Sequence, residues 1–182
     1  MPLSRSQVLV ASAVVVVLGA VIVLETKREL TTQAASASAT TSDNMAENRL
    51  SAEEEAYAGA LWPIHSGVVE TSAVELTFAG VDYVTQSPDR ERLGERVLKL
   101  NGVFRAAAAE AQTLAVPRSM QRVHDRYMEA LSLYVNASAE MRKTADDGGL
   151  DHLLEAQSMS QRAAEDLLIV GDVLWPGEHK PN

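Results

Sequence analysis

The four histidines and the carboxylates around them are the residues of this chain best suited to hold a metal ion. Helical bundles bind metals through Glu-x-x-His pairs, which place two ligands on one face of a helix. No glutamate stands three residues before any histidine and no His-x-x-x-His pair occurs; the histidines are His65, His124, His152 and His179. We therefore expect no metal site, and we expect His124 to be a surface or boundary residue of its helix.

Other patterns that carry chemistry are also missing from the sequence. There is no cysteine, which excludes disulfides, thiolate nucleophiles and iron–sulfur ligands. The chain contains no glycine-rich phosphate loop, no nucleophile elbow and no zinc motif. The sequence therefore predicts a protein that is not an enzyme and that carries no cofactor.

The two tryptophans of the chain are its most distinctive aromatic residues. Each is followed by proline, in Trp62-Pro63 and Trp175-Pro176, and each is expected at a helix boundary. We expect both indoles to be buried at the same end of the fold, where they close the hydrophobic core. The alternative is an aromatic end that accepts a ligand or contacts a membrane surface.

A polar pocket inside the core would distinguish a ligand-binding protein from a purely structural one. Tyr127, Tyr134 and Gln157 carry the hydroxyl and amide groups that we expect to line such a pocket. Together with Trp62 and Trp175, they are the candidate ligand or interface residues of this sequence.

These residues must be positioned by four predicted helices, which cover residues 51–86, 87–115, 117–145 and 150–175. Ser51 and Glu54 form a capping-box pattern, and Ser87-Pro88-Asp89 is a helix start with serine as the cap. Apolar residues recur at spacings of three and four in each segment. In the first segment the expected stripe is Tyr57, Leu61, Ile64 and Val68, followed by Val74, Phe78 and Val81.

Four such stripes joined by short connections predict an all-α fold. The expected architecture is an antiparallel up-down-up-down four-helix bundle over residues 51–176. Because Pro63 removes a helical hydrogen bond, we expect a kink there. Residues 51–62 are then an extension beyond the bundle, and residues 177–182 form a C-terminal tail.

The N-terminal region has a different composition. Residues 8–24 are uncharged and apolar, which predicts a transmembrane helix and a lipid bilayer as partner. We assign residues 1–28 to an uncleaved signal-anchor and residues 29–50 to a flexible tether rich in serine, threonine and alanine. The alternative is a cleaved secretory signal. The expected protein is a single-pass membrane protein with its helical domain outside the cytoplasm.

Charge indicates which partners the helical domain can have. The net charge of −9 argues against nucleic acid as a partner. Acidic residues concentrate in segments 51–86 and 150–175, which are neighbours in the expected bundle. This acidic face is either a solvated surface or a docking face for a basic protein or a cation.

Two functional hypotheses follow from the sequence. The first is a membrane-anchored, non-enzymatic bundle that serves as an interaction or structural module. The alternative is a bundle that binds a small ligand or cation and signals through a partner protein.

Overall fold

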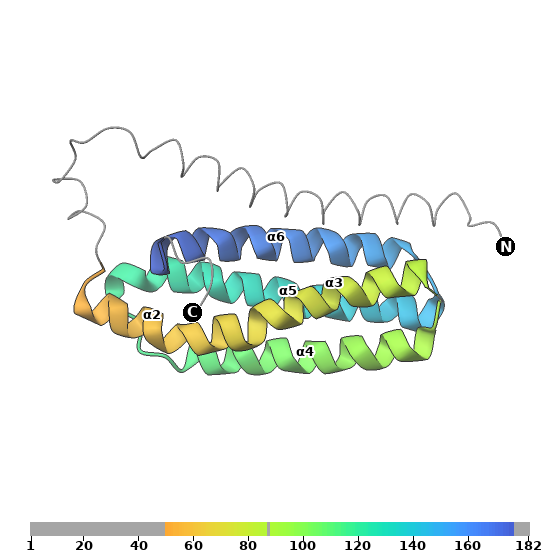
Figure 1. The fold of residues 1–182 in the computed structure, drawn as a ribbon, viewed down its shortest axis with the longest axis horizontal. Coiled ribbons are helices and arrows are strands. Elements are labelled where there is room, and N and C mark those ends of the chain that lie inside the picture. Colours follow the sequence, from red (N-terminus) through yellow and green to blue (C-terminus); the bar gives the residue numbers. More distant parts are fainter. Residues whose placement is uncertain (1–49, 87, 177–182) are drawn as a thin grey trace, which may run out of the picture. The chain divides into compact units, whose positions relative to one another are not determined.

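A computed structural model describes residues 50–86 and 88–176, which are helical and contain no strand (Figure 1). The predicted anchor and the tail lie outside these residues, as does all of the predicted tether except Leu50. None of the described helices is both long and apolar enough to cross a membrane. The elements are α2 (Ala52–Ile64), the π-helix η1 (His65–Val69), α3 (Glu70–Thr85), α4 (Arg90–Gln112), the 3₁₀ helix η2 (Arg118–Met120), α5 (Gln121–Asp147) and α6 (Asp151–Leu174).

Local sequence signals explain where these helices begin and end. The Ser51 hydroxyl accepts from the Glu54 amide, and the Ser51 amide donates to the Glu54 carboxylate, which confirms the predicted capping box. The expected serine cap of the second helix is wrong, because Asp89 accepts the bond from the Arg92 amide at 3.0 Å. At the end of α5, Gly148 adopts a φ of 85°, a left-handed conformation that favours glycine.

Contacts between neighbouring helices show an antiparallel bundle. Along α4 and α5, Arg90 donates to the carbonyl of Ala145, and Asn101 donates to the Ser138 hydroxyl. Because the residue numbers rise on one helix and fall on the other, the two helices run in opposite directions. Two pairs align α5 and α6 in the same way, namely Arg126–Asp166 and Glu140–His152.

The predicted apolar stripes of α4, α5 and α6 form most of the core. Their members are buried except at Leu114, Val123 and Ser160, which are partly exposed. The buried stripe residues are Leu93, Val97, Leu100, Phe104, Ala107 and Ala111 on α4, Met120 just before α5, Tyr127, Ala130, Tyr134, Ala137 and Met141 on α5, and Leu153, Ala156, Ala163, Leu167, Val170 and Leu174 on α6.

The first helical arm differs from the expectation at two points. Pro63 lies inside α2, and the chain continues without interruption through the π-helix into α3. Residues 51–62 are not an extension beyond the bundle, because Tyr57 and Leu61 are buried against it.

The second difference is the face of α3 that enters the core. The π-helix accommodates one extra residue, so the core positions of α3 lie one residue later than a regular helix continued from Tyr57, Leu61 and Ile64 would place them. Val69 is buried where Val68 was expected, and the predicted stripe members Val74 and Phe78 are 54% and 45% exposed. The residues of α3 that are buried instead are Ser72, Leu76, Ala79, Gly80, Tyr83 and Val84.

Candidate functional site

The two tryptophans meet at one end of the bundle, as predicted. The ring centroids of Trp62 and Trp175 are 4.8 Å apart in an edge-to-face arrangement. Both indoles are largely buried, and part of each residue remains exposed. The cause is their position at the last turns of α2 and α6, where the core is open on one side.

His65, the first residue of the π-helix, stacks directly on this pair. Its ring lies 4.9 Å from that of Trp175 with an interplanar angle of 17°. The imidazole is 7% exposed, and its Nδ1 has no hydrogen-bond partner among the described residues. Burial lowers the pKa of His65 to about 4, although Nε2 lies 3.6 Å from a carboxylate oxygen of Glu70. A neutral imidazole is therefore held among aromatic rings.

Tyr127 of α5 completes the inner side of this aromatic cluster. Its ring is 5.9 Å from that of His65, and the side chain is fully buried. The Tyr127 hydroxyl also lacks a partner among the described residues, and burial raises its pKa. Buried polar atoms without partners are rare in folded proteins, so their concentration here marks this end of the bundle.

A second polar pair lies nearby between α2 and α5. The Tyr57 hydroxyl is 3.0 Å from Nδ1 of His124, and burial raises the pKa of Tyr57 to about 12. His124 is 8% exposed, so it is a buried boundary residue and not a surface one. Its pKa is lowered by burial. This pair ties the first helical arm to the start of α5.

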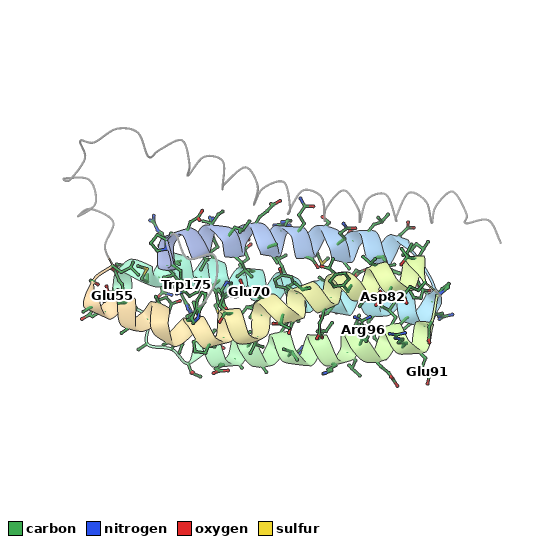
Figure 2. The ribbon with its side chains drawn as sticks, in the orientation of Figure 1. Glu55, Glu70, Asp82, Glu91, Arg96 and Trp175 are labelled. Carbon is green, nitrogen blue, oxygen red and sulfur yellow. The ribbon has the colours of Figure 1, made fainter. Side chains whose placement is uncertain are left out.

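A shallow pocket of about 320 Å³ opens beside the two indoles. Figure 2 shows Glu55 and Trp175 at the same end of the bundle, far from Asp82 and Arg96. The pocket combines two indoles, one carboxylate and aliphatic groups. Its lining consists of Leu50, Glu55, Ala58, Gly59, Trp62, Leu174 and Trp175.

The other predicted ligand residues do not form a common site. Tyr134 is buried and stacks on Phe104, with ring centroids 4.9 Å apart. Gln157 is partly exposed on α6. Within residues 50–86 and 88–176, no hydrogen bond or ring contact joins Tyr127, Tyr134 and Gln157. Tyr127 belongs to the aromatic end, and Tyr134 belongs to the middle of the core.

The outward face of α3 is unexpectedly apolar. Val74, Phe78 and Val81 are spaced by four and three residues, so they share one face of the helix. Val74 and Phe78 are exposed, and Val81 is partly exposed. We call these three residues the outer stripe. It lies opposite the core face of α3 and gives this helix two apolar sides.

The helical arm that carries the outer stripe is acidic. Residues 51–86 contain six carboxylates and no lysine or arginine. Asp82 pairs with Arg96 of α4 at 2.7 Å. Glu53, Glu55 and Glu75 are exposed, and in the described part of the chain none of them pairs with a base.

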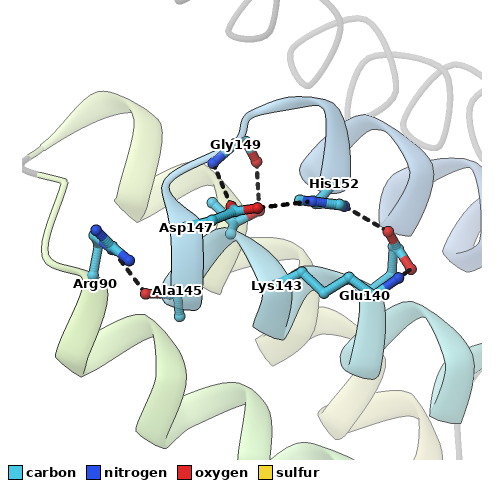
Figure 3. Close-up of polar contacts among 8 residues, drawn as sticks. Arg90, Glu140, Lys143, Ala145, Asp147, Gly149 and His152 are labelled. Carbon is cyan, nitrogen blue, oxygen red and sulfur yellow. Dashed lines mark hydrogen bonds and ion pairs between the residues drawn. The ribbon is translucent and has the colours of Figure 1, made fainter.

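The opposite end of the bundle holds a compact polar cluster around His152 (Figure 3). Its Nδ1 lies 2.6 Å from Glu140, and its Nε2 lies 3.3 Å from Asp147. The hydrogen bond with Glu140 and the charge of Asp147 raise the pKa of His152. Asp147 also accepts from the Gly149 amide, so the cluster closes the α5–α6 turn. No group of three or more potential metal ligands occurs in the described ranges.

Comparison with known proteins gives no relative from which a function could be transferred. No family model, curated protein or solved structure matches this chain. The function must therefore be argued from the geometry above. Sequence reasoning found both tryptophans but missed His65, Glu55 and Gly59. A sequence signal was available in the Trp-Pro-Ile-His order, because a proline within a helix disturbs the hydrogen bonds of the adjoining turns.

Proposed function

We propose that this protein is a non-enzymatic interaction module whose docking surface is the outer stripe of α3. The observation that carries the proposal is the second apolar face of this helix, with Val74 54% and Phe78 45% exposed. Anchors at positions i, i+4 and i+7 are those that a partner helix uses when it packs into an apolar surface. Exposed apolar groups arranged in this way favour a protein contact over a purely solvated role.

The negative charge around the outer stripe favours a basic partner. Glu70 lies one turn before Val74 on the same row of the helix, and Glu75 lies beside the outer stripe. The arm from residue 51 to residue 86 has no basic residue. A second copy of the same surface would bring carboxylates against carboxylates. The fitting partner is an amphipathic helix of another protein, with an apolar stripe bordered by lysine or arginine. Anchoring of the module through residues 8–24 belongs to the same proposal and rests on their apolar sequence.

The proposal is tested with the full chain in phosphatidylcholine nanodiscs. The probe is a synthetic helical peptide of leucine and lysine, with leucines at i, i+4 and i+7, titrated by calorimetry against empty nanodiscs. We expect binding that weakens about tenfold or more in the double variant V74S/F78S, because two apolar contacts are lost. Circular dichroism verifies that the variant stays helical.

Matched controls isolate the surface and its charge. Leu98 on α4 is 59% exposed, so Leu98→Ser removes an apolar group elsewhere and should leave binding unchanged. A leucine–glutamate peptide with the same apolar positions should not bind. Equal binding by V74S/F78S and the wild type would refute the docking surface. A dimer in sedimentation that V74S/F78S abolishes would identify a second copy as the occupant and overturn the proposed partner.

A further inference from the structure

We infer that the pocket between α2 and α6 is a binding site for an alkylammonium group. This inference is independent of the proposed docking surface, because the pocket residues lie on α2 and α6 and include no member of the outer stripe. The pocket measures about 320 Å³, which is sufficient for a small aliphatic cation. Three features of the pocket suit such a ligand, namely its aromatic lining, its carboxylate and its glycine.

The aromatic lining suits the apolar body and the charge of such a ligand. Trp62 and Trp175 both line the pocket and are only partly buried, so each retains exposed indole surface. Indole attracts a cation more strongly than the other aromatic side chains do. The stack of His65 on Trp175 holds the second indole in place from the core side.

The charge of the pocket selects a cation and rejects an anion. Glu55 lines the pocket and is exposed, with no ion pair in the part of the chain that the structure describes. The nearest acids in sequence are Glu53 and Glu54, and this arm contains no lysine or arginine that could compete for them. An ammonium bound in the pocket would pair with the Glu55 carboxylate.

Gly59 is the third feature of the pocket that suits an alkylammonium group. A glycine inside a helix is less favourable than an alanine, and a Cβ at Gly59 would meet nothing within 4 Å. Core packing therefore does not account for this glycine. Pro63 stands four residues later and has no N–H to donate to the Gly59 carbonyl. The glycine leaves the pocket open, and its carbonyl loses its usual helical donor and can accept from an ammonium.

Intrinsic fluorescence tests the site directly, because the only two tryptophans of the chain line this pocket. The full chain in the non-ionic detergent dodecyl maltoside is titrated with n-butylammonium chloride. 1-Butanol serves as the neutral probe of the same size, and sodium chloride serves as the salt control. We expect a saturable change with n-butylammonium alone. A response to 1-butanol of equal size, or no saturable response to n-butylammonium, would overturn the inference.

Two matched pairs of variants keep the test independent of folding. Glu55→Gln should weaken n-butylammonium binding about tenfold, whereas Glu53→Gln, on the same turn but outside the pocket, should not. Gly59→Leu should block binding by filling the pocket. Gly102→Leu introduces the same side chain on α4, where a Cβ also meets nothing within 4 Å, and should leave binding intact. Unchanged binding in Glu55→Gln or Gly59→Leu would refute the site.

The ammonium could belong to a free amine or to a lysine side chain of a partner. Nα-acetyl-lysine amide, titrated in parallel, separates these sources. Tighter binding of the lysine derivative than of n-butylammonium supports a protein ligand, and the reverse order supports a free amine. Loss of peptide binding to the outer stripe would not alter either result, so failure of one site is distinguishable from failure of the other.

Discussion

The two ends of the bundle each hold a histidine between helices, but in opposite environments. His65 is 7% exposed and surrounded by aromatic rings, and burial lowers its pKa to about 4. His152 lies between the carboxylates of Glu140 and Asp147, which raise its pKa. The same side chain is therefore kept neutral at one end and favoured as a cation at the other.

The two ends also differ in how completely their polar groups are paired. At the His152 end, both ring nitrogens have partners and the neighbouring turn is closed by hydrogen bonds. At the tryptophan end, two buried polar atoms have no partner among the described residues, and a pocket lies beside the indoles. Unsatisfied polar groups and a lowered pKa next to a pocket are features of functional sites.

The largest effect is expected from removing an indole of the tryptophan end. Trp175→Ala deletes contacts to Trp62 and His65 and should lower the free energy of unfolding by about 3 kcal/mol. His152→Ala at the other end removes a partly exposed group and should cost much less. Denaturant unfolding followed by circular dichroism measures both. A larger loss in His152→Ala would reverse the proposed division between the ends.

The second-largest expected effect is a loss of stability at acid pH caused by the protonation of His65. Because the folded pKa of His65 lies below its unfolded value of about 6.5, the unfolded state binds more protons between these values. The contribution of His65 to the free energy of unfolding is complete above about pH 6.5 and should be about 2 kcal/mol smaller at pH 5. Glu70, whose pKa is raised by burial, acts in the opposite direction.

Comparison of variants separates these contributions. His65→Phe preserves the aromatic stack and should flatten the loss of stability between about pH 6.5 and pH 4 relative to the wild type. His152→Gln should keep that loss. The stability that His152 contributes is present below its unfolded pKa and is lost as the pH rises through its raised folded pKa. Identical acid profiles of His65→Phe and the wild type would contradict the assignment.

The smallest effect concerns the turn at the His152 end. Gly148→Ala places a Cβ on a residue with a φ of 85° and should destabilise the protein by about 1 kcal/mol. Gly67→Ala, at a helical position where a Cβ meets nothing within 4 Å, should be neutral or stabilising. Thermal unfolding of the two variants decides whether the backbone conformation or the loss of glycine is responsible.

Spacing alone predicted most of the fold. Leu93, Val97 and Leu100 recur at helical intervals, and their burial on α4 follows from that recurrence. The meeting of Trp62 and Trp175 followed from the antiparallel order. The face of α3 was predicted wrongly for two reasons. Val74 and Phe78 are out of phase with Ile64 in a regular helix, and the π turn adds a shift of one residue that composition does not reveal.

The candidate site was less predictable for a related reason. His65 is followed by small and apolar residues, and nothing in its spacing indicates that it stacks on a tryptophan from the far end of the chain. Neither Gly59 nor Glu55 belongs to a recognisable binding motif in the sequence. They become significant only when α6 places Trp175 beside them. Pockets between helices depend on side-chain shape at a contact, which local patterns do not encode.

The π turn also changes what a deletion would do to the first helical arm. In a regular α-helix, one residue fewer rotates everything beyond it by about 100° and turns a core face away. The π turn already holds one surplus residue, so removing Gly67 converts it into an ordinary α turn. Tyr57 and Leu61 then stay in phase with Leu76 and Tyr83. This arm can lose one residue in mid-helix and keep the same side chains in the core.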